Sequence, residues 1–457
     1  MSASAPLPAA QFSPRARYGS SVRAPGTVFF GVIDRSAHVR AGYDGSVRRA
    51  RGFLVCGLAA VAGIALAHCS VYDTSLLAPA GPTITPKGGV GWWSGPGDRG
   101  CFSARAPSTA DRPAKGSDKV LPPIYLAVQS TRLGSLGEDG KLDSNAWQDI
   151  GFDLDGVCTG VESCPGEDSP PSCKPTVPQI SLDGHDCRDN TFGRLEYAAA
   201  LVPELSKTYG LSDDAFNCAL CVGDYNYLFR ISNYNGEPND DQVRVDLYPS
   251  PGLDRPLPWD CKDPSWKDHP CFTPDEKFQV TPESMTDPKP GPDLGNAKLF
   301  DDQAFVRDGY LVVKFPDESL VWFPGYKALV VAYPLLLQKG IVAGKLQRDA
   351  DGVWRITDGT IGGRIRAGDL VKGFRQLGLC EADKSYSVLV DFINKNLDVL
   401  ADGRSDPNAT CDAMSTGIAF RAQQVLAGGL ATVEPLQECV RRGTSVDDAG
   451  VKDAGAD

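Results

Sequence analysis

Two acidic turns carry the residue types in this chain that are best suited to chemistry. The first is Asp153-Leu-Asp155-Gly156 and the second is Asp183-Gly-His-Asp186-Cys-Arg-Asp189-Asn190. Closely spaced Asp, Asn and backbone carbonyl groups supply the oxygen ligands that Ca²⁺ prefers. The predicted Ca²⁺ ligands are Asp153, Asp155, Asp183, Asp186, Asp189 and Asn190. The alternative is that these side chains only cap turns by accepting backbone N–H groups. The EF-hand spacing is absent, so the two interpretations stay open.

The cysteines indicate an oxidising compartment. The chain has fourteen, and disulfides persist outside the cytosol. Cys218-Ala-Leu-Cys221 is a lone C-x-x-C pair, without the setting of a thioredoxin site or the second pair of a zinc site. We therefore predict structural disulfides, including a local one between Cys261 and Cys271. The predicted disulfide cysteines are Cys101, Cys158, Cys164, Cys173, Cys187, Cys218, Cys221, Cys261, Cys271, Cys380, Cys411 and Cys439.

Motifs for nucleophilic catalysis or for a histidine-bound metal are missing. His185 stands beside Asp186, but neither G-x-S-x-G nor H-E-x-x-H occurs, so we interpret His185 as a polar loop residue. Paired carboxyl groups, as in glycoside hydrolysis, are the remaining catalytic option. Exposed aromatic rings offer a surface for sugars, whereas buried rings pack in a core. The candidates are Trp147, Trp259, Trp266, Trp322 and Trp354.

Charge is distributed unevenly along the chain. Residues 1–68 hold eight Arg, no Lys and two acidic residues, whereas the other residues hold 38 basic and 56 acidic ones, a formal net charge of −18. This acidity argues against nucleic acid as a partner. A basic segment ahead of an acidic one is typical of an exported protein.

An export leader is predicted before residue 69. Phe53 to Ala67 is an apolar run of 15 residues behind Arg48, Arg49 and Arg51. It is shorter than a membrane-spanning helix and has the form of a signal-peptide core. Cleavage before His68 gives a soluble product, whereas cleavage before Cys69 gives a lipid-modified cysteine. Losing Cys56 with the leader and using Cys69 for lipid leaves twelve cysteines, an even number, which favours Cys69 as the lipid attachment site.

Short strands separated by turns predict a mainly β fold, an antiparallel β-sandwich of the jelly-roll kind with a few peripheral helices and several disulfides. Apolar spacing predicts helices in 192–209, 367–377 and 386–400. The predicted strands are 123–130, 148–153, 227–232, 242–248, 310–315, 319–323, 328–337, 341–347, 353–357, 360–366 and 415–425. The predicted organisation is a disordered leader with signal peptide (1–68), a Pro/Gly-rich tether (69–120), β-rich disulfide-bonded sequence (121–440) and an acidic disordered tail (441–457).

Three segments resemble a group of large secreted lipoproteins of myxobacteria. They are residues 69–77, GFDLDGVCT at 151–159 and LDGHDCRDNTFG at 182–193, and the resemblance covers residues 53–250 well. The resemblance implies a lipid site at Cys69, an outer-membrane location and β-rich architecture, but no activity. His68 departs from the small residue that the group has before its lipid cysteine.

The sequence therefore predicts an exported cell-envelope lipoprotein with a binding or structural role, for which a glycan is one candidate ligand, and it predicts no specific activity. The expected partners are the membrane, through the lipid anchor, and a carbohydrate or another envelope protein. The only cofactor predicted is Ca²⁺. The alternative function is a secreted, carboxylate-dependent hydrolase of the glycosidase type, which requires two carboxyl groups on one concave surface.

Overall fold

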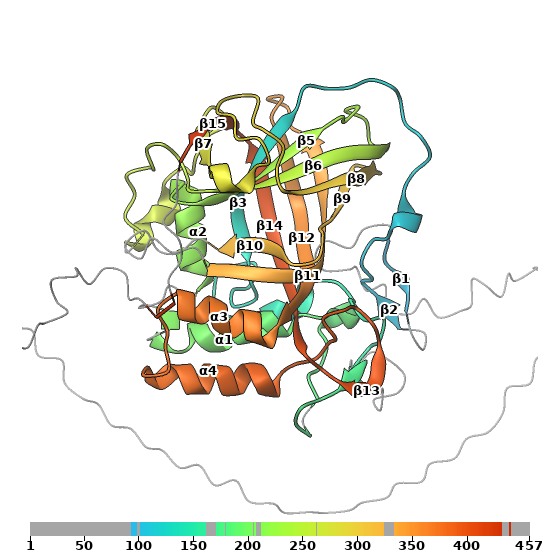
Figure 1. Ribbon diagram of the computed structural model, residues 1–457, viewed down its shortest axis with the longest axis vertical. Coiled ribbons are helices and arrows are strands. Elements are labelled where there is room, and N and C mark those ends of the chain that lie inside the picture. Colours follow the sequence, from blue (N-terminus) through green and yellow to red (C-terminus); the bar gives the residue numbers. More distant parts are fainter. Residues whose placement is uncertain are drawn as a thin grey trace, which may run out of the picture. The chain divides into compact units, whose positions relative to one another are not determined.

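A closed, eight-stranded antiparallel barrel organises the chain (Figure 1). The computed structural model describes residues 93–97, 101–160, 171–178, 180–203, 205–206, 212–261, 263–323, 333–431 and 438–439. The barrel strands are β3 (Ile124–Arg132), β5 (Asn226–Ser232), β6 (Asp240–Ser250), β8 (Leu299–Arg307), β9 (Tyr310–Lys314), β11 (Tyr333–Arg348), β12 (Trp354–Arg366) and β14 (Ala413–Gln424). Their order is β11-β12-β14-β3-β5-β6-β8-β9, and β9 pairs again with β11.

The prediction of a mainly β fold is confirmed, but the prediction of two facing sheets is wrong. The physical reason lies in β11, which is 16 residues long. Its first half pairs with β10 (Ser319–Phe323) and its second half with β9. Between the halves the register with β12 shifts, and Lys339 has a φ of +51°. Such a bulge bends a strand and helps a sheet to close. The turn predicted at Lys339-Gly340 is therefore a bulge within one strand.

Apolar side chains fill the barrel. Alternate residues of each strand, such as Leu126 and Val128 on β3, belong to one buried cluster. Phe229 on β5 stacks on Phe420 on β14, with 5.8 Å between ring centroids. The interior is thus a packed core, as in other small barrels. The hairpin predicted between residues 227 and 248 is confirmed as β5 paired with β6.

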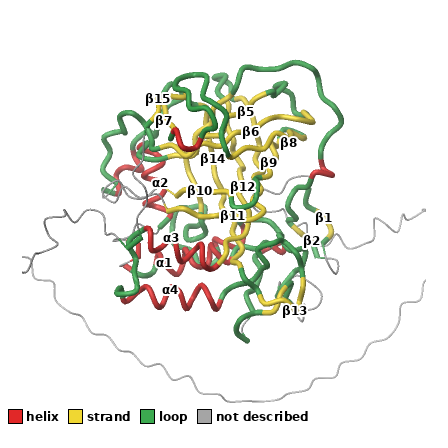
Figure 2. Tube along the Cα trace, in the orientation of Figure 1, coloured by secondary structure: helices red, strands yellow, loops and turns green. Residues whose placement is uncertain are grey.

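Four α-helices are present in the described residues. They are α1 (Thr191–Ala200), α2 (Asp213–Val222), α3 (Ala367–Gln376) and α4 (Lys384–Lys395). Figure 2 shows α1, α3 and α4 grouped below the strands, with α2 at one side. Three of the helices were predicted, and α2 was missed. Its end signals were nevertheless present, because Ser212 caps Ala215 N–H and Gly223 ends the helix with a φ of +73°.

Short strands complete the fold and cover the outside of the barrel. They are β1 (Gly95–Pro96), β2 (Phe102–Ser103), β4 (Cys173–Lys174), β7 (Lys277–Val280), β13 (Asp406–Thr410) and β15 (Leu426–Leu430). Phe278 of β7 and Ala427 of β15 join a second apolar cluster with Tyr248 of β6. The strand predicted over 148–153 is wrong, because residues Ala146–Asp149 form a 3₁₀ helix and only isolated bridges follow.

Disulfides join segments that lie outside the barrel strands. The bonds are Cys158–Cys187, Cys173–Cys411, Cys218–Cys261, Cys221–Cys271 and Cys380–Cys439. Cys101 is also disulfide-bonded, whereas Cys164 lies outside the described residues. The predicted Cys261–Cys271 bond is wrong. Cys218 and Cys221 lie one turn apart on α2 and share a face, so each bonds one cysteine of the loop that follows β6.

No helix within the described residues is long and apolar enough to cross a membrane. The predicted leader, the lipid attachment residue Cys69 and the predicted tail from residue 441 all lie outside those residues.

Glu196 on α1 makes stability depend on pH. Its side chain is 1% exposed, and Oε2 has no hydrogen-bond partner among the described residues. Burial, with a smaller contribution from the charge of Asp213, raises the pKa of Glu196 to about 8. Since its pKa in an unfolded chain is about 4.3, the folded chain holds a proton that the unfolded chain releases between these values. Stability therefore falls as pH rises through this window.

Glu196→Gln removes this dependence, because Gln stays neutral. We expect the stability of the variant relative to the wild type to increase by roughly 3 to 4 kcal/mol between pH 5 and pH 8. Urea denaturation at the two pH values measures the difference. Glu283→Gln, at an exposed position, is the control and should give no such difference. A Glu196→Gln effect of equal size at both pH values would contradict the assignment.

Candidate cation site

The two acidic turns pack against the outer face of β12 and β14, and glycines make the close approach possible. A Cβ atom on Gly417 of β14 would lie 2.6 Å from the Cα of Gly151, and one on Gly362 of β12 would lie 2.5 Å from the ring of Phe152. Real Cβ contacts are not this short, so these positions require glycine. In the Gly-rich run at 359–363, packing against the first acidic turn explains Gly362, whereas Gly359 makes room for the ring of Phe420.

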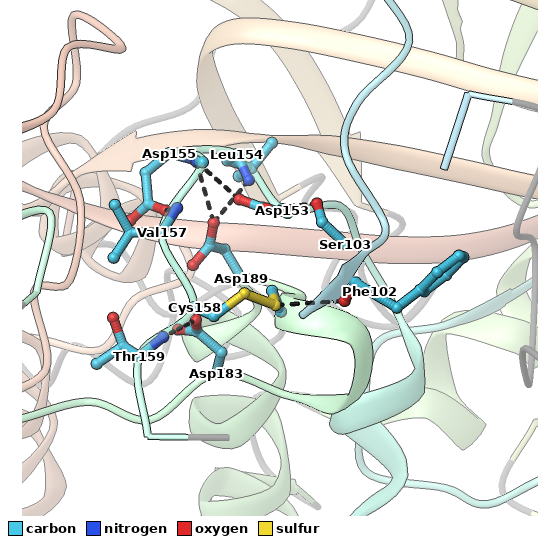
Figure 3. The surroundings of a disulfide bond; sticks show 12 residues. Phe102, Ser103, Asp153, Leu154, Asp155, Val157, Cys158, Thr159, Asp183 and Asp189 are labelled. Atoms are coloured by element: carbon cyan, nitrogen blue, oxygen red, sulfur yellow. Dashed lines mark hydrogen bonds between the residues drawn. A yellow bond between two sulfur atoms is a disulfide. The ribbon is translucent and has the colours of Figure 1, made fainter. Parts of the chain in front are cut away.

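Asp153 and Asp155 of the first turn lie beside Asp189 of the second turn (Figure 3). Each of the three offers a carboxylate oxygen within 4.8 Å of the others. Asp189 Oδ2 accepts the N–H groups of Leu154, at 2.6 Å, and Asp155, at 3.3 Å. Asp153 Oδ1 accepts Gly156 N–H at 2.7 Å, and its Oδ2 accepts the Ser103 hydroxyl. Backbone N–H groups thus hold the carboxylates in place despite their like charge.

The second turn adds Asp183, and a distant segment adds Asp398. Asp183 Oδ2 accepts Thr159 N–H at 2.6 Å. Asp398 lies between α4 and β14, where its carboxylate accepts Ser415 N–H at 2.8 Å and the Thr191 hydroxyl at 2.7 Å. Asp398 was not among the predicted ligands, because its local sequence carries no signal that would identify it. Only the tertiary fold brings it to the acidic turns.

A small cavity separates these carboxylates. It is lined by Asp155, Asp183 and Asp398. Thr159, Ser181 and the disulfide-bonded Cys411 are among its other lining residues. The cavity volume is about 10 Å³, which is close to the smallest volume that holds one water molecule. The cavity therefore has room for about one water molecule between these residues.

The pKa values of the clustered carboxyl groups are raised. Burial, followed by the charge of Asp155, raises the pKa values of Asp183 and Asp189 well above the usual range for aspartate. Burial also raises the pKa of Asp155, and that of Asp398 to about 6. The positive charges that act on these groups include Arg364, which donates to the Leu154 carbonyl, and Arg194, which acts on Asp398.

Five carboxyl groups thus gather where burial disfavours their charge. The physical options are to bind protons or to bind a cation, since an uncompensated buried charge is costly. The predicted residues Asp153, Asp155, Asp183 and Asp189 lie in this cluster, together with Asp398.

Asp186 and Asn190 have other roles in the structure. The Asp186 carboxylate lies 3.6 Å from the Arg188 guanidinium, and the residue has a left-handed φ of +55°. Asn190 caps α1, where its Oδ1 accepts Gly193 N–H and Gly417 N–H. His185 lies on the surface and bonds Asp149 through Nδ1 at 2.8 Å.

A larger groove lies beside this region, at the other half of β12 and β14. Its volume is about 590 Å³, within the range of small-molecule sites. Charged side chains of both signs line it, together with the half-buried ring of Trp266. The charged lining residues are Arg132, Glu138, Asp149, Asp213, Asp214, Lys267, Asp358 and Arg421.

The five tryptophan candidates are distributed differently. Trp266 alone among them lines the groove in the described residues. Trp147 is buried, Trp354 packs on Tyr234, and Trp259 stacks on His269 with ring centroids 4.0 Å apart. The side chain of Trp322 lies outside the described part of the structure.

Comparison with known proteins gives no relatives: no family model, no curated protein and no solved structure matches this chain.

Gly417→Ala tests how the acidic turns are attached to the barrel. The added methyl group would meet backbone atoms of Gly151 and Ile150, which cannot move aside as a flexible side chain can. We expect a loss of roughly 2 kcal/mol in the free energy of unfolding, in line with other overpacked sites. The control is Gly429→Ala on β15, where nothing lies within 4 Å of the new methyl group. Equal stabilities of the two variants in urea denaturation would show that the turns are not held in this way.

Proposed function

We propose that this chain is an exported protein of the cell envelope, anchored by a lipid on Cys69, that binds a glycan in the groove lined by Trp266. The observation that carries the proposal is the lining of the groove, which combines an aromatic ring with charged groups of both signs.

The lining suits a sugar for chemical reasons. Sugar hydroxyls donate and accept hydrogen bonds, so they match a surface that offers both Arg132 and Arg421 and the carboxylates of the groove. An aromatic ring supplies an apolar contact at one side, as the half-buried Trp266 does. A ligand of one charge sign matches the mixed lining less well.

Three of the five carboxylates that line the groove are engaged by other groups of the protein, which favours binding over hydrolysis. A glycosidase needs one carboxyl group to donate a proton and a second to act as base or nucleophile. Asp213 accepts four hydrogen bonds, from Ser135 O–H and three backbone N–H groups. Asp214 pairs with Lys267 at 2.8 Å and Asp149 with His185. These three carboxylates are therefore engaged by the protein itself.

The cysteines support export and the lipid anchor. Eleven of the twelve cysteines predicted to form disulfides lie in the described residues, and all eleven are disulfide-bonded. Disulfides in this number fit an oxidising compartment. Lipid modification of Cys69 would leave an even number of cysteines in the predicted mature chain.

The lipid anchor is tested by intact mass spectrometry of the protein from its native membrane. We expect the mature chain to begin at Cys69 with added acyl mass. Cys69→Ser should abolish that mass and release the protein from the membrane fraction. A wild-type chain that begins at His68 without added mass would contradict the anchor.

Trp266→Ala tests the groove. We expect binding to the best oligosaccharide from an array of neutral and anionic glycans to weaken roughly tenfold, because a ring contact is lost. Trp259→Ala is the matched control, since that ring stacks on His269 and does not line the groove. Isothermal titration of the purified full chain measures both. The proposal fails if no glycan binds, or if the two variants bind equally well.

A further inference from the structure

We propose that the groove selects a zwitterionic sugar, one that carries both a carboxylate and an ammonium group. Arg421 of β14 would bind the carboxylate, and Asp358 of β12 would bind the ammonium group. This inference rests on the function proposed above, because it names the class of glycan that the groove binds. Both side chains are exposed and line the groove.

An irregularity in the barrel wall places Asp358 opposite Arg421. The register between β12 and β14 shifts between Ile356 and Gly359. Two residues of β12, Thr357 and Asp358, therefore face the single residue Arg421, which is the arrangement of a β-bulge. Bulges occur next to functional sites, where they re-aim a side chain. Here all three residues line the groove.

Arg421 projects from the outer face of the barrel. Its neighbours along β14, Phe420 and Ala422, belong to the core inside the barrel, and successive side chains of a strand point to opposite faces. The register with β3, on the other side of β14, also shifts between Arg421 and Ala422. The regular ladder is therefore interrupted on both sides of Arg421, at the point where this guanidinium meets the groove.

Asparagine side chains hold the adjoining part of β3 in place. The pairing of β3 with β5 extends only to Ala127. Beyond that point, Asn226 bonds the N–H and the carbonyl of Val128 at 2.8 and 2.9 Å. Asn217, which lines the groove, bonds the N–H and the carbonyl of Thr131 at 2.7 and 2.9 Å. The wall of the groove is thus positioned before a ligand binds.

Arg421 and Asp358 differ from the other charged residues of the groove. Their side chains make no ion pair and no hydrogen bond within the described residues, with each other or with other groups. Ligand charges of both signs would therefore find groups that are not already neutralised. The other charged lining residues have partners in the protein: Asp214 with Lys267 at 2.8 Å, Asp149 with His185 at 2.8 Å, Arg132 with Glu138 at 3.9 Å, and Asp213 with Ser135 at 2.7 Å.

The chemistry of these two groups defines the ligand. A guanidinium binds a carboxylate through two parallel N–H···O bonds, and a carboxylate accepts charge-assisted bonds from an ammonium group. A ligand with one charge would leave the opposite side chain unmatched. The half-buried ring of Trp266 adds an apolar contact, which a sugar ring offers and a small free amino acid lacks. An amino sugar with a carboxylate therefore fits the groove best.

Isothermal titration of the purified full chain with five small probes tests the inference, in slightly acidic buffer that keeps the amino groups protonated. Muramic acid carries both charged groups on a sugar ring. Glucosamine carries only the ammonium group, glucuronic acid only the carboxylate, and glucose neither, whereas glycine carries both groups without a ring. We expect muramic acid to bind at least roughly tenfold more tightly than each of the other four probes.

Two variants separate the contributions of the charged groups. Arg421→Gln should lower the affinity for muramic acid to that for glucosamine, and Asp358→Asn should lower it to that for glucuronic acid. The matched controls are Arg255→Gln and Asp254→Asn, at exposed positions after β6 that do not line the groove. They should keep the wild-type preference. All four side chains are exposed, so the variants should fold, which circular dichroism checks.

The inference is overturned if glucose or either singly charged sugar binds the wild type as tightly as muramic acid, or if Arg421→Gln and Asp358→Asn keep the preference. Equal binding of glycine would overturn the assignment to a sugar. Failure of muramic acid to bind, while a glycan of the array binds through Trp266, overturns this inference and leaves the proposed function intact. If no glycan binds at all, both fail.

Discussion

Five carboxyl groups of like charge are packed between a barrel wall and loops closed by disulfides, and this arrangement constrains the rest of the structure. Each group loses hydration on burial and gains repulsion from its neighbours, which is why the pKa values of Asp183, Asp189 and Asp398 rise. A flexible loop would relieve the repulsion by moving its side chains into water. The cluster persists only because the surroundings are rigid.

That rigidity comes from several levels of the fold. The barrel supplies a packed core and a fixed outer face, and Gly362 and Gly417 let the turns approach it closely. Disulfides Cys158–Cys187 and Cys173–Cys411 restrict the loops that carry the acids. The groove is lined by residues 357–360 of β12 and 419–421 of β14. Asp149 lines the groove and bonds His185 of the second turn, so it connects the two regions physically.

The sequence allowed the local features to be predicted. Alternating apolar residues gave the β5–β6 hairpin, and the spacing of the acids identified Asp153, Asp155, Asp183 and Asp189 as neighbours. The missing information is tertiary. Asp398 joins the cluster from a segment more than 200 residues away along the chain, and no local pattern marks it. Asp186 and Asn190 have the right chemistry, but Arg188 and the start of α1 determine where they point.

The barrel and the disulfide pairing were also not predicted, because both depend on tertiary structure. Strand spacing is the same in a sandwich and in a barrel, and closure depends on the bulges of β11 and its pairing with two different strands. Cysteine spacing suggested that Cys261 and Cys271 bond each other. In the structure, helix α2 presents Cys218 and Cys221 on one face, so that Cys218 bonds Cys261 and Cys221 bonds Cys271.

The central claim is that the fold buries these carboxyl groups together and thereby raises their pKa values. The most direct measurement is a pH titration of the Asp398 side-chain carboxyl carbon in the full chain by nuclear magnetic resonance. The account predicts a pKa of about 6 for Asp398, because burial disfavours its charged form. A pKa near the usual value for aspartate, about 3.9, would contradict it.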